Sequence, residues 1–519
     1  MAYLRIQLWL LACLSVLGGA AQTPDARHYT FSITLNDSTN RIRGQAVIQV
    51  HFTGASPLLQ LDLAGPKGGK GMRVRTVAEG RKTLSFVQDS AALHIRVRAS
   101  AGSLHTYRID YDGIPADGLI IGANRYGSRT FFGDNWPDRA HQWLPCIDHP
   151  SDKAPVDFIV TAPDHYQVVA PGVKTEETPL GGHQLRTHWS EKVPLPSKVM
   201  VIGVADFAIS PPVTVQGIPV YSYIFPQDKD RGFQDYALAD RILPFYIAKI
   251  GPYAYEKLAN VQSKTIFGGM ENASAIFYAE KSVGSAGIEE LMAHEIAHQW
   301  FGDAVTETDY RHLWLSEGFA TYMTHLYMED RYGADTLRAG MQADRHLVLG
   351  FARQHPVAVV DTGMQGDYMR LLNANSYQKG GWVLHMLRRS IGDSLFWEGI
   401  RRYYALYGGR NASTESFRAV MESVTGKDLG PFFTQWLYTP GVPRLDMIWT
   451  NPEAGTWVLH IEQEQTPLFS FPLEYSIKGT LYTQQISGRI AEVRFPEGTI
   501  PEDVRIDPRV SLLAEMRLH

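Results

Sequence analysis

Cysteine and long apolar stretches are scarce in this sequence. The 519 residues include two cysteines, Cys13 and Cys146, and Cys13 lies in an N-terminal apolar run over Ile6–Leu17. That run has twelve residues, which is too short to span a bilayer, and it follows a basic residue and precedes the small residues Gly18–Ala21. This order is typical of a cleavable export signal over residues 1–21. Removal of the signal would leave Cys146 alone, which excludes an internal disulfide.

Export carries a further expectation about the host. We expect an exported protein, periplasmic or secreted, with no stable membrane insertion after the signal is cleaved. Three Asn-X-Ser sequons begin at Asn36, Asn272 and Asn411, and Asn272 lies in a motif that we predict to line a substrate cleft. A glycan there would obstruct the cleft. A compartment that does not glycosylate, such as a bacterial envelope, therefore fits the sequence better.

A basic surplus is also missing. Lysine and arginine number 49 against 54 aspartates and glutamates, which gives a formal net charge of −5. This balance gives no support for binding to nucleic acid or to an anionic membrane, so neither is an expected partner. Long repeats and low-complexity tracts are not visible, while 44% hydrophobic residues provide for a large core. A chain of this length typically forms about two to four domains, and the sequence leaves the oligomeric state open.

The pattern of apolar residues changes twice along the chain. Short alternating strands run to about Ile209, amphipathic helical patterns follow as far as Leu437, and strands return after Pro443. We therefore predict a multidomain α+β fold. Its parts are an N-terminal all-β saddle or sandwich (22–210), a central, mainly helical catalytic domain (211–440) and a small C-terminal β-sandwich (441–519).

Two histidines are spaced to share one face of a predicted helix over 288–301. His294 and His298 are separated by about one helical turn, so both imidazoles can reach one ion. Zinc catalysis needs a third protein ligand and one open position for water. Glu317 offers a carboxylate from a second predicted helix, after eighteen intervening residues. We predict one zinc ion on these two histidines and Glu317, with Glu295 as the general base toward the water.

Two further motifs flank the predicted zinc site. Upstream, the segment 267–272 contains two adjacent glycines, which let a ligand approach the backbone closely. The acidic residue of this segment, Glu271, can hold the positive charge of a free amino end in a desolvated site. Downstream, Tyr377 precedes a predicted helix over 380–391, where its phenol can donate a hydrogen bond to an oxyanion. Considered singly, these residues are also consistent with an exposed acid in a tight turn and with a core tyrosine.

The three motifs, in this order, resemble the aminopeptidase N family of zinc metallopeptidases. This family belongs to the gluzincin class and also includes leukotriene hydrolase. The resemblance extends from about Tyr29 to Pro440, and several independent motifs agree in order and spacing. The matching residues are Gly268–Asn272, His294–His298, Glu317 and Tyr377–Gly380.

The resemblance implies a thermolysin-like catalytic domain and a role for each motif. Glu271 would anchor the α-amino group of the substrate, and Tyr377 would stabilise the tetrahedral intermediate. A second amine-binding residue, carried by the β domain in relatives, would correspond to Asn135. The residues implied to line the first subsite and to hold the peptide backbone are Gly268, Gly269 and Met270.

We therefore predict a zinc-dependent aminopeptidase that hydrolyses the N-terminal peptide bond of peptides with a free N-terminus. Attack by an activated water needs a base, a Lewis acid and an oxyanion donor, and the motifs offer all three. One alternative is a zinc endopeptidase of the same fold. Glu271 counts against it, because a carboxylate at the end of the cleft disfavours an uncharged continuing chain. The other alternative is a catalytically inactive binding scaffold, for which the loss of a ligand or of the base is expected.

Overall fold

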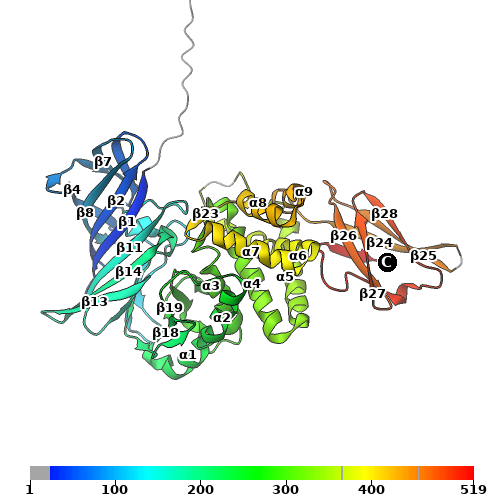
Figure 1. The fold of residues 1–519 in the computed structure, drawn as a ribbon. Helices are drawn as coiled ribbons and strands as arrows, with labels where there is room; N and C mark the ends of the chain where they lie inside the picture. The colour runs from blue at the N-terminus through cyan, green and yellow to red at the C-terminus, as the bar shows by residue number, and fades with distance from the viewer. Residues whose placement is uncertain (1–23, 364–365, 454) are drawn as a thin grey trace, which may run out of the picture.

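The computed structural model describes residues 24–363, 366–453 and 455–519. The predicted export signal over residues 1–21 lies outside this described part. Figure 1 shows three parts in a row: an N-terminal β part in blue and cyan, a mainly helical middle in green and yellow, and a C-terminal β part in orange and red. This order confirms the predicted fold class. No helix among the described residues combines the length and the apolar composition needed to cross a membrane.

The N-terminal part contains an eight-stranded sheet in the order β13-β14-β11-β1-β2-β8-β4-β5 and two smaller sheets. Strand β2 alternates between buried and more exposed residues, so one face of the large sheet covers the core. The large sheet comprises β1 (Asp25–Thr34), β2 (Ile42–Phe52), β4 (Gly71–Glu79), β5 (Lys82–Thr83), β8 (Ser103–Ile114), β11 (Lys153–Pro163), β13 (Val173–Leu180) and β14 (Gln184–Pro196). The smaller sheets comprise β3 (Ser56–Asp62), β6 (Phe86–Gln88) and β7 (Ala92–Ala99), and β9 (Leu119–Ala123), β10 (Arg129–Gly133), β12 (Gln167–Val169) and β15 (Gly203–Ala205).

The middle part begins with a mixed sheet that the sequence pattern does not predict. Strands β19 (Leu258–Ser263) and β21 (Ala275–Ala279) pair in parallel and are buried along their whole length. Strands buried on both faces show no polar–apolar alternation, so they lack the usual sequence signal. The remaining strands of this sheet are β16 (Ala208–Ile209), β17 (Val213–Val215), β18 (Ile218–Ile224) and β20 (Gly269–Met270). A separate short pair joins β22 (Val305–Glu307) to β23 (Arg410–Ala412).

Two helices lie between β18 and β19 of this sheet, and the others follow it along the chain and carry most of the candidate site. A π-helical turn over 375–379 leads directly into α6. π-helical turns are rare in proteins overall, and those that occur are often found at functional sites. The helices are α1 (Lys229–Tyr236), α2 (Ala239–Lys249), α3 (Ile288–His298), α4 (Trp314–Tyr332), α5 (Ala334–Gln354), α6 (Gly380–Ile391), α7 (Asp393–Tyr407), α8 (Thr414–Thr425) and α9 (Gly430–Phe433).

The C-terminal part contains two small sheets that pack against the helical middle. His385 of α6 lies with its Nε2 2.9 Å from the carbonyl oxygen of Val510, and Lys379 Nζ donates to the carbonyl oxygen of Gly441 at 2.8 Å. These contacts fix the π-helical turn and α6 against the C-terminal part of the chain. The strands are β24 (Arg444–Glu453), β25 (Thr456–Gln463), β28 (Ile490–Arg494) and β30 (Glu515–Leu518) in one sheet, and β26 (Phe471–Ile477), β27 (Thr480–Ile486) and β29 (Val504–Ile506) in the other.

Candidate active site

Helices α3 and α4 bring three potential metal ligands together. The Nε2 atoms of His294 and His298 lie 3.1 Å apart. The Oε2 atom of Glu317 is 3.3 Å from the first and 3.2 Å from the second. A tetrahedral zinc ion with bonds of about 2.0–2.1 Å holds its ligand atoms about 3.3 Å apart. The spacing and the donor set of two imidazoles and one carboxylate therefore fit a single zinc ion.

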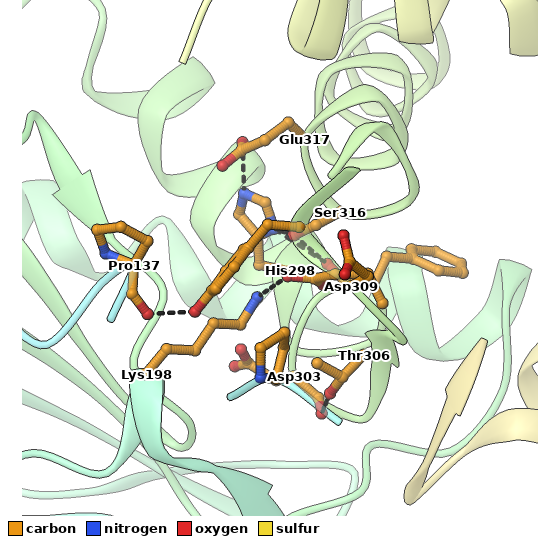
Figure 2. A network of polar contacts seen from close by, with 12 residues as sticks. Pro137, Lys198, His298, Asp303, Thr306, Asp309, Ser316 and Glu317 are labelled. Carbon is orange, nitrogen blue, oxygen red and sulfur yellow. Dashed lines mark hydrogen bonds and ion pairs between the residues drawn. The ribbon is translucent and has the colours of Figure 1, made fainter. Parts of the chain in front are cut away.

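The ring of His298 is oriented by groups on the side away from this cluster. Its Nδ1 lies 3.0 Å from the carbonyl oxygen of Phe301 and 3.1 Å from Ser316 Oγ. Figure 2 shows the ring between Glu317 on one side and Ser316 on the other. A carbonyl oxygen only accepts, so Nδ1 carries the proton and Nε2 keeps its lone pair for a metal.

Close contact between two helices sets the position of Tyr377 relative to the three ligands. A Cβ on Gly318 of α4 would lie 2.8 Å from the backbone of Gly380 at the start of α6. Only two glycines permit this approach. The approach brings the turn with Tyr377 over His294, and the two rings stack with centroids 5.9 Å apart at 12°. Burial and the nearby carboxylates raise the pKa of Tyr377 well above its ordinary value, so the phenol keeps its proton and can donate it in a hydrogen bond.

These residues line a cleft of about 260 Å³. Strand β20 forms one wall, and a Cβ on Gly269 would lie 2.3 Å from Oε1 of Glu295. The absence of a side chain at this position is therefore what lets the Glu295 carboxylate lie against the strand. Residues lining the cleft are Trp136, Phe267, Gly268, Gly269, Met270, Glu271, Leu291, His294, Glu295, His298, Glu317, Leu372 and Tyr377.

Three buried carboxylates give the cleft an excess of negative charge. Glu271, Glu295 and Glu317 are each at most 5% exposed. Burial, with repulsion from the other carboxylates, raises the pKa of Glu271 and Glu295. Without a metal ion, burial lowers the pKa of His298, but the same carboxylates outweigh this effect and raise it to about 10; a metal ion bound at Nε2 would replace the proton there. Buried anions need cations nearby, so the cleft is suited to bind both a metal ion and a positively charged ligand group.

Of the three carboxylates, Glu271 has an oxygen, Oε1, that is buried and lacks a hydrogen-bond partner among the described residues. Its backbone is fixed by Gln299, which follows the second histidine: Gln299 Nε2 donates to the carbonyl oxygen of Glu271 at 2.7 Å and to Asp303 Oδ2 at 2.8 Å. The backbone of Glu271 is thus held in place, while one oxygen of its carboxylate has no partner among the described residues.

A buried ion pair that the sequence does not predict lies behind this site. Lys198, from the N-terminal part, lies with its Nζ 2.6 Å from Oε1 of Glu307, and both side chains are fully buried. Burial lowers the pKa of Lys198, but the carboxylates of Glu307 and Glu271 outweigh this effect and raise it. Figure 2 shows the lysine extending toward the segment that carries Asp303 and Thr306. The available signal is a lysine directly before the apolar segment 199–205.

The structure contradicts one predicted substrate contact. Asn135 is fully buried, and its Nδ2 donates to the carbonyl oxygens of Ser197 at 3.1 Å and Met200 at 2.8 Å. Its Oδ1 accepts from Trp143 Nε1 at 2.8 Å. The side-chain amide of Asn135 therefore has its hydrogen-bond partners within the protein. The adjacent residue, Trp136, lines the cleft instead. Every other residue predicted from the sequence for the metal, the base, the oxyanion donor or the substrate lines the cleft.

Comparison with known protein families gives two matches. Residues 25–199 match the model of the peptidase M1 N-terminal domain, and residues 236–436 match the model of the peptidase family M1 domain.

Curated relatives and a solved structure agree with these matches. The chain is 29% identical over 349 residues to aminopeptidase M1-C of Oryza sativa subsp. japonica, covering 63% of this chain and 38% of that protein. It is 22% identical over 458 residues to the leucyl aminopeptidase of Saccharolobus solfataricus (81% and 54%), and 24% over 330 residues to human glutamyl aminopeptidase (60% and 34%). The fold is similar to that of Legionella pneumophila aminopeptidase A in complex with aspartic acid, with a TM-score of 0.83 at 16% identity, covering 97% of this chain and 60% of that one. The chain thus spans about a third to three fifths of the length of these relatives.

Proposed function

Because the chain belongs to peptidase family M1, the aminopeptidase N family, we propose that it is a zinc-dependent aminopeptidase that releases the N-terminal residue of peptides. The observation that carries the proposal is Glu271. This buried carboxylate has an unpartnered oxygen in the same cleft as the His294–His298–Glu317 cluster. A free α-ammonium group is the part of a peptide that satisfies such an oxygen, through a charge-assisted hydrogen bond.

The three ligands would hold the zinc ion, which supplies Lewis acidity that lowers the pKa of water and polarises a carbonyl group. Glu295 takes the proton from the attacking water at its carboxylate and passes it to the nitrogen of the leaving amine. Burial raises the pKa of Glu295 and so increases its affinity for that proton. Tyr377 donates a hydrogen bond from its phenol to the substrate carbonyl oxygen as negative charge develops there.

Glu271 also bears on the two alternatives. An endopeptidase would place an uncharged chain against the unpartnered carboxylate, which would leave a buried charge without compensation. The missing side chain of Gly269 leaves room for the Glu295 carboxylate to lie against strand β20. An inactive scaffold would not need this arrangement. Both observations favour an active exopeptidase.

The cleft further favours an apolar first residue in the substrate. Its walls include Trp136, Phe267, Met270 and Leu372, and no lysine or arginine is among the described residues that line it. Relatives named as leucyl and as glutamyl aminopeptidases both match the chain. Recognition of an acidic side chain normally requires a cationic partner, so we propose a preference of the leucyl kind.

Export remains part of the proposal and rests on the N-terminal sequence pattern. The Asn272 side chain is fully buried in the folded protein, so a glycan attached to this sequon would not fit. This burial supports the view that the protein does not pass through a glycosylating compartment. Amino-terminal sequencing of the protein recovered from the cell envelope or the medium, with a start near Gln22 expected, tests this point.

A panel of chromogenic amino-acid amides tests the function. Each amide is assayed with a free amine and with an N-acetyl block, in the presence of zinc. We expect hydrolysis of free-amine leucine, methionine and phenylalanine amides at least about tenfold faster than of the glutamate amide, and almost no hydrolysis of blocked forms. Comparable rates on blocked and free substrates would replace the aminopeptidase with the endopeptidase, and no hydrolysis of any member by zinc-loaded protein would favour the scaffold.

A further inference from the structure

Strand β20 gives the direction in which a bound peptide leaves the catalytic cleft. In the described sheet β20 pairs with β21 on one side and ends the strand order β16-β18-β19-β21-β20. Gly269 lies against Glu295, and Glu271 follows at the carboxyl end of the strand. A peptide held by its amine at Glu271 and cleaved beside Glu295 therefore continues past Gly268 toward Phe267, antiparallel to β20. Free strand edges commonly bind peptides in this extended way.

A second, larger groove begins where this path leads. Gly268 and Phe267 line both the catalytic cleft and a groove of about 600 Å³. The other residues lining the groove are Arg125, Ser263, Lys264, Thr265, Ile266, Ala279, Glu280 and Lys281. The two depressions are thus continuous along the segment that precedes β20.

The groove carries more positive than negative charge. It is lined by three cationic side chains and one carboxylate, and that carboxylate, Glu280, already accepts a hydrogen bond from the backbone of Arg125 at 3.0 Å. The lysine ion pairs of the described residues involve neither Lys264 nor Lys281. Lys264 is half-buried, and its Cε would be 3.9 Å from a Cβ on Gly122 of β9, so the side chain lies along the N-terminal part. Both ammonium groups are available to an anion.

The distances along the chain suit a short peptide. Lys264 lies five positions before Gly269, which is at most about 18 Å of backbone. An extended peptide advances about 3.3 Å per residue. A carboxylate on the third to fifth residue of a substrate anchored at Glu271 therefore falls within reach of the groove.

We infer that this groove is a downstream subsite that binds a carboxylate on the third to fifth residue of the peptide, supplied by a free C-terminus or by an acidic side chain. The inference rests on the proposed function and adds a preference among its substrates. Lys264 and Lys281 supply the recognition, and the groove lies outside the reach of a single amino-acid amide. Because Lys281 is exposed and Lys264 is only half-buried, each contact is weak and is screened by salt.

Two peptide pairs test the inference and separate the two sources of the carboxylate. The first pair is Leu-Ala-Ala-Ala with a free or an amidated C-terminus, and the second is Leu-Ala-Glu-Ala amide and Leu-Ala-Gln-Ala amide. In at least one pair we expect kcat/KM to be about three- to tenfold higher for the anionic member at low salt, mostly through KM, with the ratio falling in 0.5 M salt. A ratio near one in both pairs, with all four peptides hydrolysed, would overturn the subsite and leave the aminopeptidase proposal intact. Failure to hydrolyse any peptide or amino-acid amide would instead refute the proposed function.

A matched pair of variants assigns the effect to the groove. The double variant Lys264→Gln/Lys281→Gln should reduce the ratio to about one. The control Lys67→Gln/Lys82→Gln removes the same charge from exposed lysines of the N-terminal part and should keep the wild-type ratio. An equal loss of the ratio in both variants would mean that overall charge, and not the groove, produces the preference, and would overturn the inference. Circular dichroism melts of both variants verify that they are folded.

Discussion

A methyl group added at Gly269 should disable the general base without unfolding the protein. In Gly269→Ala the new Cβ would lie 2.3 Å from Oε1, 2.5 Å from Cδ and 2.7 Å from Cγ of Glu295. No such contact can persist, so one of the two groups must move. The atoms in conflict belong to the end of a flexible side chain, and the Glu295 carboxylate is therefore the group that gives way.

The structure sets the size of the effect. Relief of the clash to a normal contact of about 3.2 Å requires a displacement of about 0.9 Å. A misplacement of about 1 Å at a reacting group costs about a hundredfold in rate, which corresponds to about 2.7 kcal/mol of transition-state stabilisation. We expect kcat to fall by about this factor. The zinc content and the melting temperature should stay close to those of the wild type, because the three ligands and the packing of the helices are untouched.

The neighbouring glycine provides the control. A Cβ on Gly268 would meet only Leu291 Cδ1 at 3.9 Å, an ordinary van der Waals contact. Both variants are assayed for kcat and KM on leucine p-nitroanilide, with zinc content and melting temperature measured on the same samples. We expect the loss of kcat in Gly269→Ala to exceed that in Gly268→Ala at least tenfold. Equal kcat in the two variants would refute the placement of the base against this strand.

Three further predictions concern other residues. Tyr377→Phe should lower kcat about a hundred- to a thousandfold with little change in KM and with zinc retained; a lower melting temperature with normal turnover would instead identify a core tyrosine. Glu271→Ala should weaken kcat/KM for free-amine substrates about ten- to a hundredfold, the worth of one charge-assisted contact, and an unchanged value would remove Glu271 from amine recognition. Burial raises the pKa of Asp152 from 3.8 to about 7, so its contribution to stability is present below about pH 4 and is lost as the pH rises through 7. Asp152→Asn should remove this dependence of stability on pH. If the melting temperatures of the two proteins change in parallel from pH 4 to pH 8, the raised pKa assigned to Asp152 is wrong.

Local patterns in the sequence were sufficient for the elements that carry the metal ligands. The helix predicted over 380–391 agrees with α6 in both bounds, and the two histidines fall within α3 as their spacing predicts. A helical turn fixes the relative position of residues four apart, so this part of the site needs no knowledge of the tertiary fold. The long helix α5 is absent from the prediction, although its buried residues Leu337, Met341, Asp344 and Val348 recur at helical spacing. Only four positions in this helix of 21 residues are buried, and one of them is acidic, which weakens the apolar pattern.

Features that depend on distant parts of the chain were not predictable in this way. Lys198 and Glu307 are 109 residues apart, and nothing local to either residue indicates the other. The same holds for Asn135, because two of its three hydrogen-bond partners, Ser197 and Met200, lie 62 and 65 residues away along the chain. A family motif identified which part of the β domain approaches the cleft, but the fold decides that the neighbouring Trp136 faces it. Prediction therefore fails where side-chain direction is set by long-range packing.

The most direct test of the central claim is a joint measurement of zinc content and activity in Glu295→Gln and His298→Ala. We propose that His294, His298 and Glu317, which lie close enough to hold one metal ion, bind the zinc and that Glu295 transfers the proton. We predict that Glu295→Gln retains about one zinc per chain while turnover of leucine p-nitroanilide falls by several orders of magnitude. His298→Ala should lose both the metal and the activity. A zinc-free Glu295→Gln, or a Glu295→Gln that retains zinc and near-normal turnover, would contradict this division of roles.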